Sequence, residues 1–430
     1  MELLADRMRD NIAKTKYLII GNSAGGIGAA EAIRSRDKVG EITIVSDEPY
    51  PAYSRILISK YFIGERDLDH MLLRPLDFHD VNNITFLSGK KVAKLLLHSH
   101  EIELEDSSRF SYEKLMLALG GSPVIPELDG CDKDGVFTYT KLDNIKAIDK
   151  YLDRVRTAVV YGGGLIGTSA AEALAERGLK VTMIVRSRML RTVLDAHASS
   201  VVALTLERAG VTVLTGHTAV KITGDSKVKG VVLDDGNSLP CDLLVVATGV
   251  SPRIELASKA GIMVDSGIVV NRHMQTSNPD VYACGDVAQV HDYVYGQNRV
   301  TPVWPGAYNG GVVAGSNMAG KSVEYDGGTS MNTLSYFGLN IASAGITMPT
   351  DEGHEVLVND SGDNYQKIVL RDDCIVGFVL LGNIDKAGAI LSIMKERIDV
   401  SSIKQDILSK SAGGLVNLLW HMRLESIKSN

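Results

Sequence analysis

The stretch KYLIIGNSAGGIGAAEAIR (Lys16–Arg34) decides the fold, because an apolar run stops at Gly21 and an alanine-rich segment follows at once. This pattern predicts a strand, a tight glycine turn and a helix. Such a turn directs backbone N–H groups and the positive end of the helix dipole at one point, which suits a pyrophosphate. The GxGxxG register is imperfect, since Ser23 replaces its second glycine. Taken singly, this copy could equally be an ordinary βα turn.

A second copy downstream strengthens the interpretation. TAVVYGGGLIGTSAAEALAE (Thr157–Glu176) contains a complete GxGxxG between an apolar run and another alanine-rich helix. Two such units predict an α/β protein with two Rossmann-like domains that bind two nucleotides. The candidate nucleotide-binding residues of the two turns are Gly21, Ser23, Ala24, Gly25 and Gly26 in the first, and Gly162, Gly164, Leu165, Ile166 and Gly167 in the second.

Composition excludes several function classes. The chain of 430 residues has 45% hydrophobic and 23% charged residues, which is ordinary for two to three globular domains. A formal net charge of -7 and a pI near 5.8, with no basic block, argue against nucleic acid as a partner. The charged start lacks the features of a signal peptide and no run is long enough for a bilayer span, so we expect a cytoplasmic protein without membrane partners.

Cysteine spacing limits the chemistry further. The four cysteines, Cys131, Cys241, Cys284 and Cys374, are scattered, and none forms a CxxC or CxxxxC pair or a zinc-type cluster. A redox disulfide within one local motif is therefore excluded, and no metal site is predicted.

The ends of two strands carry candidate recognition residues. The strand predicted at Ile42–Val45 is followed by Asp47 and Glu48, and a carboxylate there suits a ribose hydroxyl pair, although a polar turn is the plain alternative. The strand predicted at Lys180–Val185 is instead followed by Arg186 and Arg188.

These arginines bear on the choice of nucleotide. A carboxylate at this position accepts from the 2′-hydroxyl of NAD, whereas arginine pairs with the 2′-phosphate of NADP. We therefore favour NADPH over NADH, with a solvated basic turn as the alternative.

The segment Tyr53-Ser54-Arg55-Ile56-Leu57-Ile58-Ser59-Lys60 resembles a motif of the pyridine nucleotide-disulfide oxidoreductase superfamily. It is most similar to the branch of ferredoxin reductases and NADH:rubredoxin reductases that lacks a redox disulfide. The resemblance implies that Arg55 contacts FAD, that Ser59 belongs to the same cofactor segment, and that Lys60 reaches the flavin near its reactive nitrogen. A cation beside that ring favours the anionic reduced flavin. The alternative is a surface loop.

Further motifs match the same superfamily. The resemblance implies that Val92 contacts the adenine through its backbone, that Gly285 and Asp286 approach the ribityl chain, and that Trp304 stacks near the flavin ring. Its two ATG-type strand ends are represented by Ala118 and Gly120, and by Ala247, Thr248 and Gly249. Departures from the pattern include Ser23, Leu119 in place of threonine, Ile56 in place of proline, and Ser169 where the superfamily places a glutamate beside the flavin-side lysine.

We expect a discontinuous FAD-binding domain at 1–122 and 248–325, an NAD(P)-binding domain at 123–247, and a C-terminal α+β interface domain at 326–430. The resemblance implies an NAD(P)H oxidoreductase that exchanges electrons with an iron–sulfur partner of ferredoxin or rubredoxin type, alone or as the flavin subunit of a larger complex. An NAD(P)H oxidase or CoA-disulfide reductase is a second reading, but no cysteine precedes Cys131. A low-turnover sensor or structural subunit is the third. The oligomeric state, including a homo-oligomer, and the direction of electron flow stay open.

Overall fold

The computed structural model describes residues 12–417 except 363 and 410, together with Trp420. The charged start of the chain (1–11), which entered the prediction of a cytoplasmic protein, lies outside the described residues. The chain forms two compact units. Unit 1 comprises Met1–Leu57, Arg66–Ser122 and Val250–Thr329, and unit 2 comprises Ile58–Glu65, Pro123–Gly249 and Ser330–Asn430. None of the described helices combines the length and apolar character that a membrane crossing requires.

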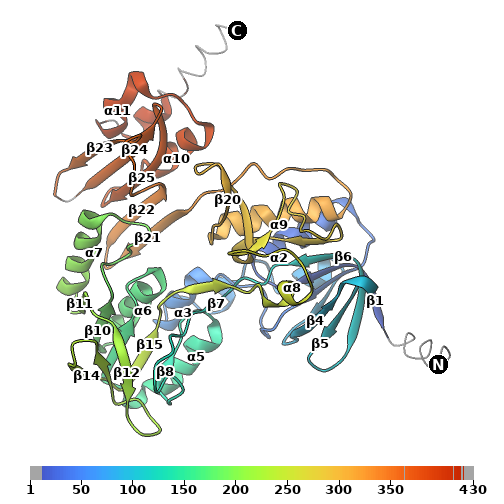
Figure 1. Ribbon diagram of the computed structural model, residues 1–430, viewed down its shortest axis with the longest axis horizontal. Coiled ribbons are helices and arrows are strands. Elements are labelled where there is room, and N and C mark those ends of the chain that lie inside the picture. The colour runs from blue at the N-terminus through green and yellow to red at the C-terminus, as the bar shows by residue number, and fades with distance from the viewer. Residues whose placement is uncertain (1–11, 363, 410, 418–419, 421–430) are drawn as a thin grey trace. The chain divides into compact units, whose positions relative to one another are not determined.

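Unit 1 is built on a seven-stranded sheet with the order β3-β2-β1-β6-β5-β4, in which β18 pairs with β6 (Figure 1). Its central strands β1, β2, β3, β6 and β18 run parallel, and β4 and β5 form an antiparallel edge. The bounds are β1 (Ala13–Ile20), β2 (Ile42–Val45), β3 (Ile84–Leu87), β4 (Val92–Leu96), β5 (Glu101–Leu104), β6 (Arg109–Leu117) and β18 (Val281–Ala283). The parallel strands are apolar because both faces of the sheet are buried.

Two helices of unit 1 pack closely against each other. They are α2 (Ala24–Arg36) and α9 (Trp304–Met318), and they meet through glycines: a Cβ on Gly311 would lie 2.1 Å from the Gly25 carbonyl oxygen. Short elements complete the unit: α4 (Phe78–Val81), β7 (Gly121–Pro123), β16 (Val250–Pro252), α8 (Glu255–Lys259), β17 (Ile268–Val269), β19 (Ala288–Asp292) and β20 (Gln297–Val300). β7 and β16 pair where the chain leaves and re-enters unit 1.

Unit 2 contains a second parallel sheet with the order β11-β10-β9-β15-β8 and a small antiparallel sheet of β12, β13 and β14. The bounds are α3 (Ile58–Phe62), β8 (Val136–Phe137), α5 (Leu142–Tyr151), β9 (Thr157–Tyr161), α6 (Leu165–Glu176), β10 (Lys180–Val185), α7 (Ala196–Arg208), β11 (Thr212–Thr215), β12 (Ala219–Thr223), β13 (Gly230–Leu233), β14 (Ser238–Pro240) and β15 (Leu243–Val246).

The C-terminal part of unit 2 is an antiparallel sheet with the order β21-β22-β25-β24-β23, covered by two helices (Figure 1). Its bounds are β21 (Met331–Tyr336), β22 (Leu339–Gly345), β23 (Glu355–Asp360), β24 (Tyr365–Arg371), β25 (Cys374–Leu381), α10 (Ala387–Glu396) and α11 (Lys404–Ser409). The predicted α/β class, with two parallel Rossmann-like sheets and a smaller C-terminal α+β part, is confirmed. The boundaries of the three predicted domains stay a prediction.

Candidate functional site

The two glycine turns have the same backbone geometry. Gly21 and Gly162 both have positive φ, +115° and +128°, which a residue with a side chain rarely adopts. A Cβ on Gly21 would lie 2.2 Å from the carbonyl oxygen of Ala118, and one on Gly162 would lie 2.1 Å from that of Ala247. Each turn therefore presses against the end of a neighbouring parallel strand, β6 in unit 1 and β15 in unit 2.

The third glycine of each motif packs the helix onto its turn. A Cβ on Gly26 would lie 1.9 Å from the Gly21 carbonyl oxygen, and one on Gly167 would lie 2.0 Å from that of Gly162. The second position is different: Gly164 has φ −86° and open space around it. Ser23, its counterpart, begins α2 with φ −122° and makes no capping hydrogen bond with its side chain. A side chain is therefore compatible with the second position of the motif. This explains how the first copy, with Ser23 in place of glycine, forms the same turn as the second.

The structure separates the two carboxylates that follow β2. Glu48 is buried, accepts a 2.6 Å hydrogen bond from the Tyr53 hydroxyl, and forms an ion pair with Arg55. Asp47 is more exposed and lies 3.2 Å from the guanidinium of Arg253. Asp47 also lines a hollow of about 380 Å³ together with Lys90, Lys91, Glu105, Asp106 and neighbouring residues. The Arg55 side chain is therefore tied to a buried carboxylate, although it is itself exposed.

Other predicted FAD residues gather at one edge of the unit 1 sheet. Gly21 follows β1, Ala118 follows β6 and Gly285 follows β18, and the carboxyl ends of parallel strands share one edge. Gly120 and Gly285 both have positive φ. Burial raises the pKa of the Asp286 carboxyl, and the charge of Arg55 opposes that rise. Val92 lies at the first position of β4 on the antiparallel side of the sheet.

Unit 1 also contains two buried hydrogen-bond donors that find no acceptor among the described residues. They are Nδ2 of Asn22, inside the first glycine turn, and Nε1 of Trp304, at the start of α9. Buried donors without partners are rare in folded proteins. The Trp304 ring stacks on Tyr308 with 5.8 Å between centroids and 3° between planes. The tight turn and the two unpaired donors fit a cofactor that carries phosphate and carbonyl acceptors.

Lys60 lies in unit 2, on α3, next to Ser59. The Ser59 hydroxyl accepts a 3.2 Å hydrogen bond from the buried Tyr139. The Lys60 ammonium pairs with Glu65 at 3.0 Å. This hydrogen bond raises the pKa of Lys60; burial opposes the rise, and the charges of Glu176 and Glu172 add to it.

Position 169 provides no carboxylate, but Glu172 lies one helical turn later on the same helix, α6. α6 packs against α3, and Glu172 on α6 lies within electrostatic reach of Lys60. Glu172 accepts a 2.6 Å hydrogen bond from the backbone N–H of Phe337, and burial raises the pKa of its carboxyl. Ser169 is instead hydrogen-bonded to Tyr336. The sequence signal was the i, i+3 spacing from Ser169 to Glu172, which places both on one helix face.

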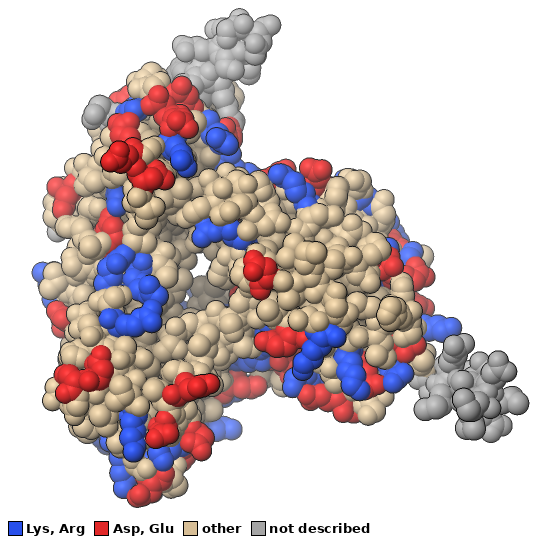
Figure 2. Space-filling model, in the orientation of Figure 1, with Lys and Arg blue, Asp and Glu red and all other residues tan. Residues whose placement is uncertain are grey.

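The arginines that follow β10 have different environments. The side chain of Arg186 is exposed and has no ion pair or hydrogen bond within the described part of the chain, and the same holds for Arg191, which the sequence reasoning did not consider. Arg188 is half-buried, and its Nη2 lies 3.3 Å and 3.4 Å from the carbonyl oxygens of Arg191 and Leu194. Figure 2 shows basic side chains gathered on the part of unit 2 where Figure 1 labels α6, α7 and β21.

The predicted second ATG lies at the end of β15. The carbonyl oxygen of Ala247 contacts the second turn, and the Thr248 hydroxyl donates a 2.8 Å hydrogen bond to the carbonyl of Val124. Gly249 has φ +151°. Leu165 and Ile166 form the first residues of α6, directly after the turn. The predicted nicotinamide-nucleotide residues therefore come together around the end of the second parallel sheet.

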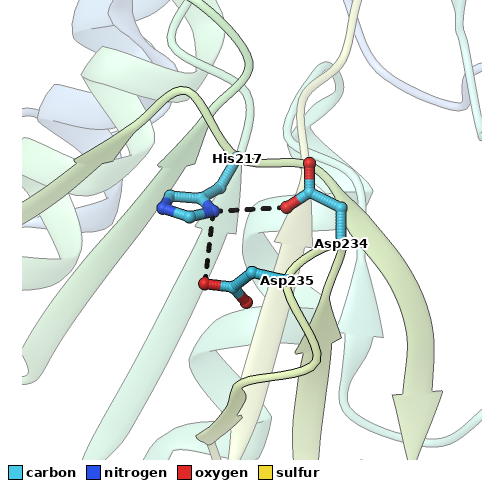
Figure 3. A group of neighbouring side chains, drawn as sticks. All are labelled: His217, Asp234 and Asp235. Carbon is cyan, nitrogen blue, oxygen red and sulfur yellow. Dashed lines mark hydrogen bonds and ion pairs between the residues drawn. The ribbon is translucent and has the colours of Figure 1, made fainter.

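One group of potential metal ligands comes together among the described residues, although the sequence predicts no metal site (Figure 3). Nδ1 of His217 lies 3.2 Å from Asp234 and 3.7 Å from Asp235. All three side chains are at least one-third exposed, and the carboxylates already accept hydrogen bonds from Thr218 and Asn237. This group has the character of a surface ion pair.

Comparison with known proteins agrees with this geometry. The family model "Pyridine nucleotide-disulphide oxidoreductase" matches residues 15–311. The chain belongs to this family. A model of the rubredoxin NAD+ reductase C-terminal domain matches residues 331–398, so the oxidoreductase carries the C-terminal domain of the branch that the sequence resembles.

Relatives of the oxidoreductase include subunits of larger enzymes. It is 33% identical over 406 residues to the assimilatory nitrate reductase electron transfer subunit of Bacillus subtilis, covering 93% of this chain and 52% of the relative. It is 30% identical to the NADH-dependent phenylglyoxylate dehydrogenase subunit epsilon of Aromatoleum evansii, covering 91% of this chain and 94% of that subunit. The chain thus spans about half the length of the Bacillus relative.

A solved covalent complex of putidaredoxin reductase with putidaredoxin matches with a TM-score of 0.84 and 25% identity, covering 92% of this chain and 99% of the matched one. The resemblance seen in the sequence is confirmed, as is the prediction of an NAD(P)H-dependent flavoprotein oxidoreductase. FAD and NAD(P)H are the cofactors typical of this family.

Proposed function

We propose that this protein takes electrons from NADPH and passes them, through FAD, to a one-electron iron–sulfur protein or to an iron–sulfur subunit of a larger complex. The observation that carries the proposal is the pair of matching glycine turns with opposite charges at the ends of the second strands. Asp47 follows β2 in unit 1, whereas Arg186 follows β10 in unit 2. The first arrangement suits ribose hydroxyls and the second suits a 2′-phosphate.

In this proposal unit 1 holds FAD. The N–H groups of the turn from Gly21 to Gly26 bind the pyrophosphate, and Asp47 at the hollow accepts from the adenosine ribose. Glu48 orients Arg55 toward the cofactor, and Asp286 accepts from the ribityl chain. Asn22 and Trp304 supply their unpaired donors. FAD, when bound, takes up the two electrons of a hydride and releases them singly.

In the same proposal the second turn binds the pyrophosphate of NADPH, and Arg186, with Arg191 five residues further along the same loop, pairs with the 2′-phosphate. Lys60 supplies a positive charge to the reduced flavin, and Glu65 and Glu172 keep its ammonium protonated. In this proposal Glu172, one helical turn after Ser169, and Glu65, which follows α3, take the place of the carboxylate that position 169 does not provide.

The partner is proposed from chemistry and from the relatives. The four cysteines are free thiols and none precedes residue 131, so the chain offers no dithiol next to the Lys60 segment that could carry electrons onward. Single-electron release to an external centre remains the route that these residues support. The named electron transfer subunit and the reductase–putidaredoxin complex among the similar proteins support a protein acceptor.

The test uses the purified protein under anaerobic conditions. We expect a yellow protein whose visible absorbance bleaches with stoichiometric NADPH and more slowly with NADH, and which then reduces an added [2Fe–2S] ferredoxin or a rubredoxin. Protein that binds no flavin, or that stays oxidised with both nucleotides, contradicts the proposal. Rapid bleaching with no transfer to either iron–sulfur protein, but fast reduction of dioxygen or a CoA disulfide, would favour the oxidase or disulfide-reductase reading.

A further inference from the structure

The loop from Arg186 to Asp195, between β10 and α7, is held in one conformation by several independent contacts. Leu190 is fully buried and has φ +50°, an uncommon conformation for a residue with a large side chain. Its N–H donates a 2.7 Å hydrogen bond to the carbonyl of Gly163, the second residue of the glycine turn. Strained residues of this kind persist only where the surrounding structure determines them. The loop therefore fixes one peptide group of the nucleotide-binding turn directly.

Gly163 is also enclosed by this loop and by its strand. A Cβ at Gly163 would lie 2.6 Å from Val185 and 3.2 Å from the sulfur of Met189. The Ser199 hydroxyl on α7 donates a 2.7 Å hydrogen bond to the Met189 carbonyl. Any shift of the loop is thus transmitted to the turn.

Arg188 holds the loop together from inside. Its Nη2 reaches the carbonyls of Arg191 and Leu194 and lies 2.7 Å from the sulfur of Met348, which follows β22 of the C-terminal sheet. Its Nε is buried and has no acceptor among the described residues. The guanidinium is therefore engaged with the loop's own backbone, in contrast to the exposed guanidinium of Arg186.

The far end of the loop is fixed by the C-terminal sheet. Asp195 caps α7 by accepting from the Ala198 N–H at 2.9 Å. The same carboxylate accepts from the Tyr365 hydroxyl at 2.8 Å and from the Lys367 ammonium at 2.9 Å, both on β24. The loop is thus tied to the turn through Leu190 and to the C-terminal sheet through Asp195 and Met348.

We propose that Arg188 is a positioning residue that holds this loop against the glycine turn, and that it does not itself bind the 2′-phosphate. This inference rests on the proposed function in one respect, namely that the turn binds a nicotinamide nucleotide. It replaces the sequence-based expectation that Arg186 and Arg188 act alike. Loss of Arg188 loosens a turn that both nucleotides use, whereas loss of Arg186 removes a contact that only the 2′-phosphate makes.

The experiment measures dissociation constants of NAD+ and NADP+ by calorimetry on the flavin-loaded protein, because the oxidised nucleotides bind without reducing the flavin. The variants are Arg188→Met, Arg188→Lys and Arg186→Met, and Lys180→Met is the matched control, since Lys180 is an exposed cation at the opposite end of β10. Melting temperatures show whether each variant is folded.

We expect Arg188→Met to weaken NAD+ and NADP+ by similar factors, roughly tenfold each, because two hydrogen bonds from a charged donor are lost. Arg188→Lys should weaken both as well, because both hydrogen bonds come from Nη2 and the shorter lysine side chain does not place its ammonium there. Arg186→Met should weaken NADP+ alone, and Lys180→Met should change neither constant.

The inference is overturned if Arg188→Met weakens NADP+ alone, or if it leaves both constants unchanged. If Arg188→Met does not fold, Arg188→Lys decides: an unchanged NAD+ constant with a largely retained NADP+ constant would identify Arg188 as a direct phosphate contact. A wrong nucleotide preference gives a different result from a wrong role for Arg188. The unmodified protein would then bind NAD+ and NADP+ equally, while Arg188→Met would still weaken NAD+ binding.

Discussion

Alanine substitutions at the third glycine of each motif should each impair only one of the two proposed nucleotide sites. In Gly26→Ala the new methyl group would lie 1.9 Å from a carbonyl oxygen of its own turn, and in Gly167→Ala it would lie 2.0 Å away. Ordinary contact begins near 3.4 Å, so helix and turn must separate by roughly 1 Å or more, and the obstacle is backbone that cannot rotate aside. Overpacking of this kind costs about 1–3 kcal/mol of stability, occasionally more.

That cost is small enough for the protein to fold, since domains are typically stable by about 5–15 kcal/mol. The displacement is nevertheless large for a site whose N–H groups must meet phosphate oxygens, because hydrogen bonds lengthened by about 1 Å are lost. We therefore expect Gly26→Ala to purify folded but without flavin. Gly167→Ala should keep its flavin and lose reduction by NADPH and NADH.

The assay combines the flavin absorbance per chain, the rate of anaerobic bleaching and the melting temperature. Gly388→Ala in α10 is the matched control, because it has open space around it and lies in the C-terminal part of the chain. If Gly26→Ala retains stoichiometric flavin, or if Gly167→Ala loses flavin while Gly26→Ala does not, the assignment of the two turns is wrong.

Three further predictions concern charges in unit 2. Arg186→Glu should weaken NADP+ binding roughly a hundredfold and leave NAD+ within about threefold, as measured by calorimetry; an unchanged preference would refute the 2′-phosphate assignment. Glu172→Gln should raise the melting temperature at pH 8, because burial raises the pKa of Glu172 and its charged form is therefore disfavoured in the folded protein. That advantage should vanish as the pH falls below the ordinary glutamate pKa of 4.5, where the carboxyl is neutral in both states, and an advantage that persists there would contradict the assignment. Asp195→Ala should cost about 2–4 kcal/mol in urea unfolding, since it removes a helix cap and leaves the largely buried Lys367 ammonium without its carboxylate; a loss below about 0.5 kcal/mol would show that neither contact matters.

Sequence reasoning located the parallel strands and their turns well. The strands predicted at Ile42–Val45 and Lys180–Val185 coincide with β2 and β10. These strands and turns are determined by residues close together in the sequence. Each strand is a short apolar run that ends at a glycine or a charged residue, and the turn needs glycine because of its backbone conformation.

Tertiary contacts could not be predicted in the same way. Ser169 indicated that Lys60 lacked a carboxylate, but only the packing of α6 against α3 shows that Glu172 lies near it. Arg186 and Arg188 carry the same charge two residues apart, and the sequence gives no reason to separate them. Their difference arises because Leu190 turns the loop inward, which brings backbone carbonyls to Arg188.

The equivalence of the two turns has a consequence for specificity. Because the glycines place the same backbone groups in both units, pyrophosphate binding alone would not distinguish FAD from NADPH in the proposed function. We expect the distinction to come from side chains at the ends of β2 and β10, where Asp47 is a carboxylate at the hollow and Arg186 is a cation with no internal partner among the described residues. An exposed arginine with no ion pair among the described residues stays available to a phosphate dianion, whereas a carboxylate repels one. We therefore expect the loop that follows β10, and not the complete set of glycines in the second motif, to decide which nicotinamide nucleotide binds.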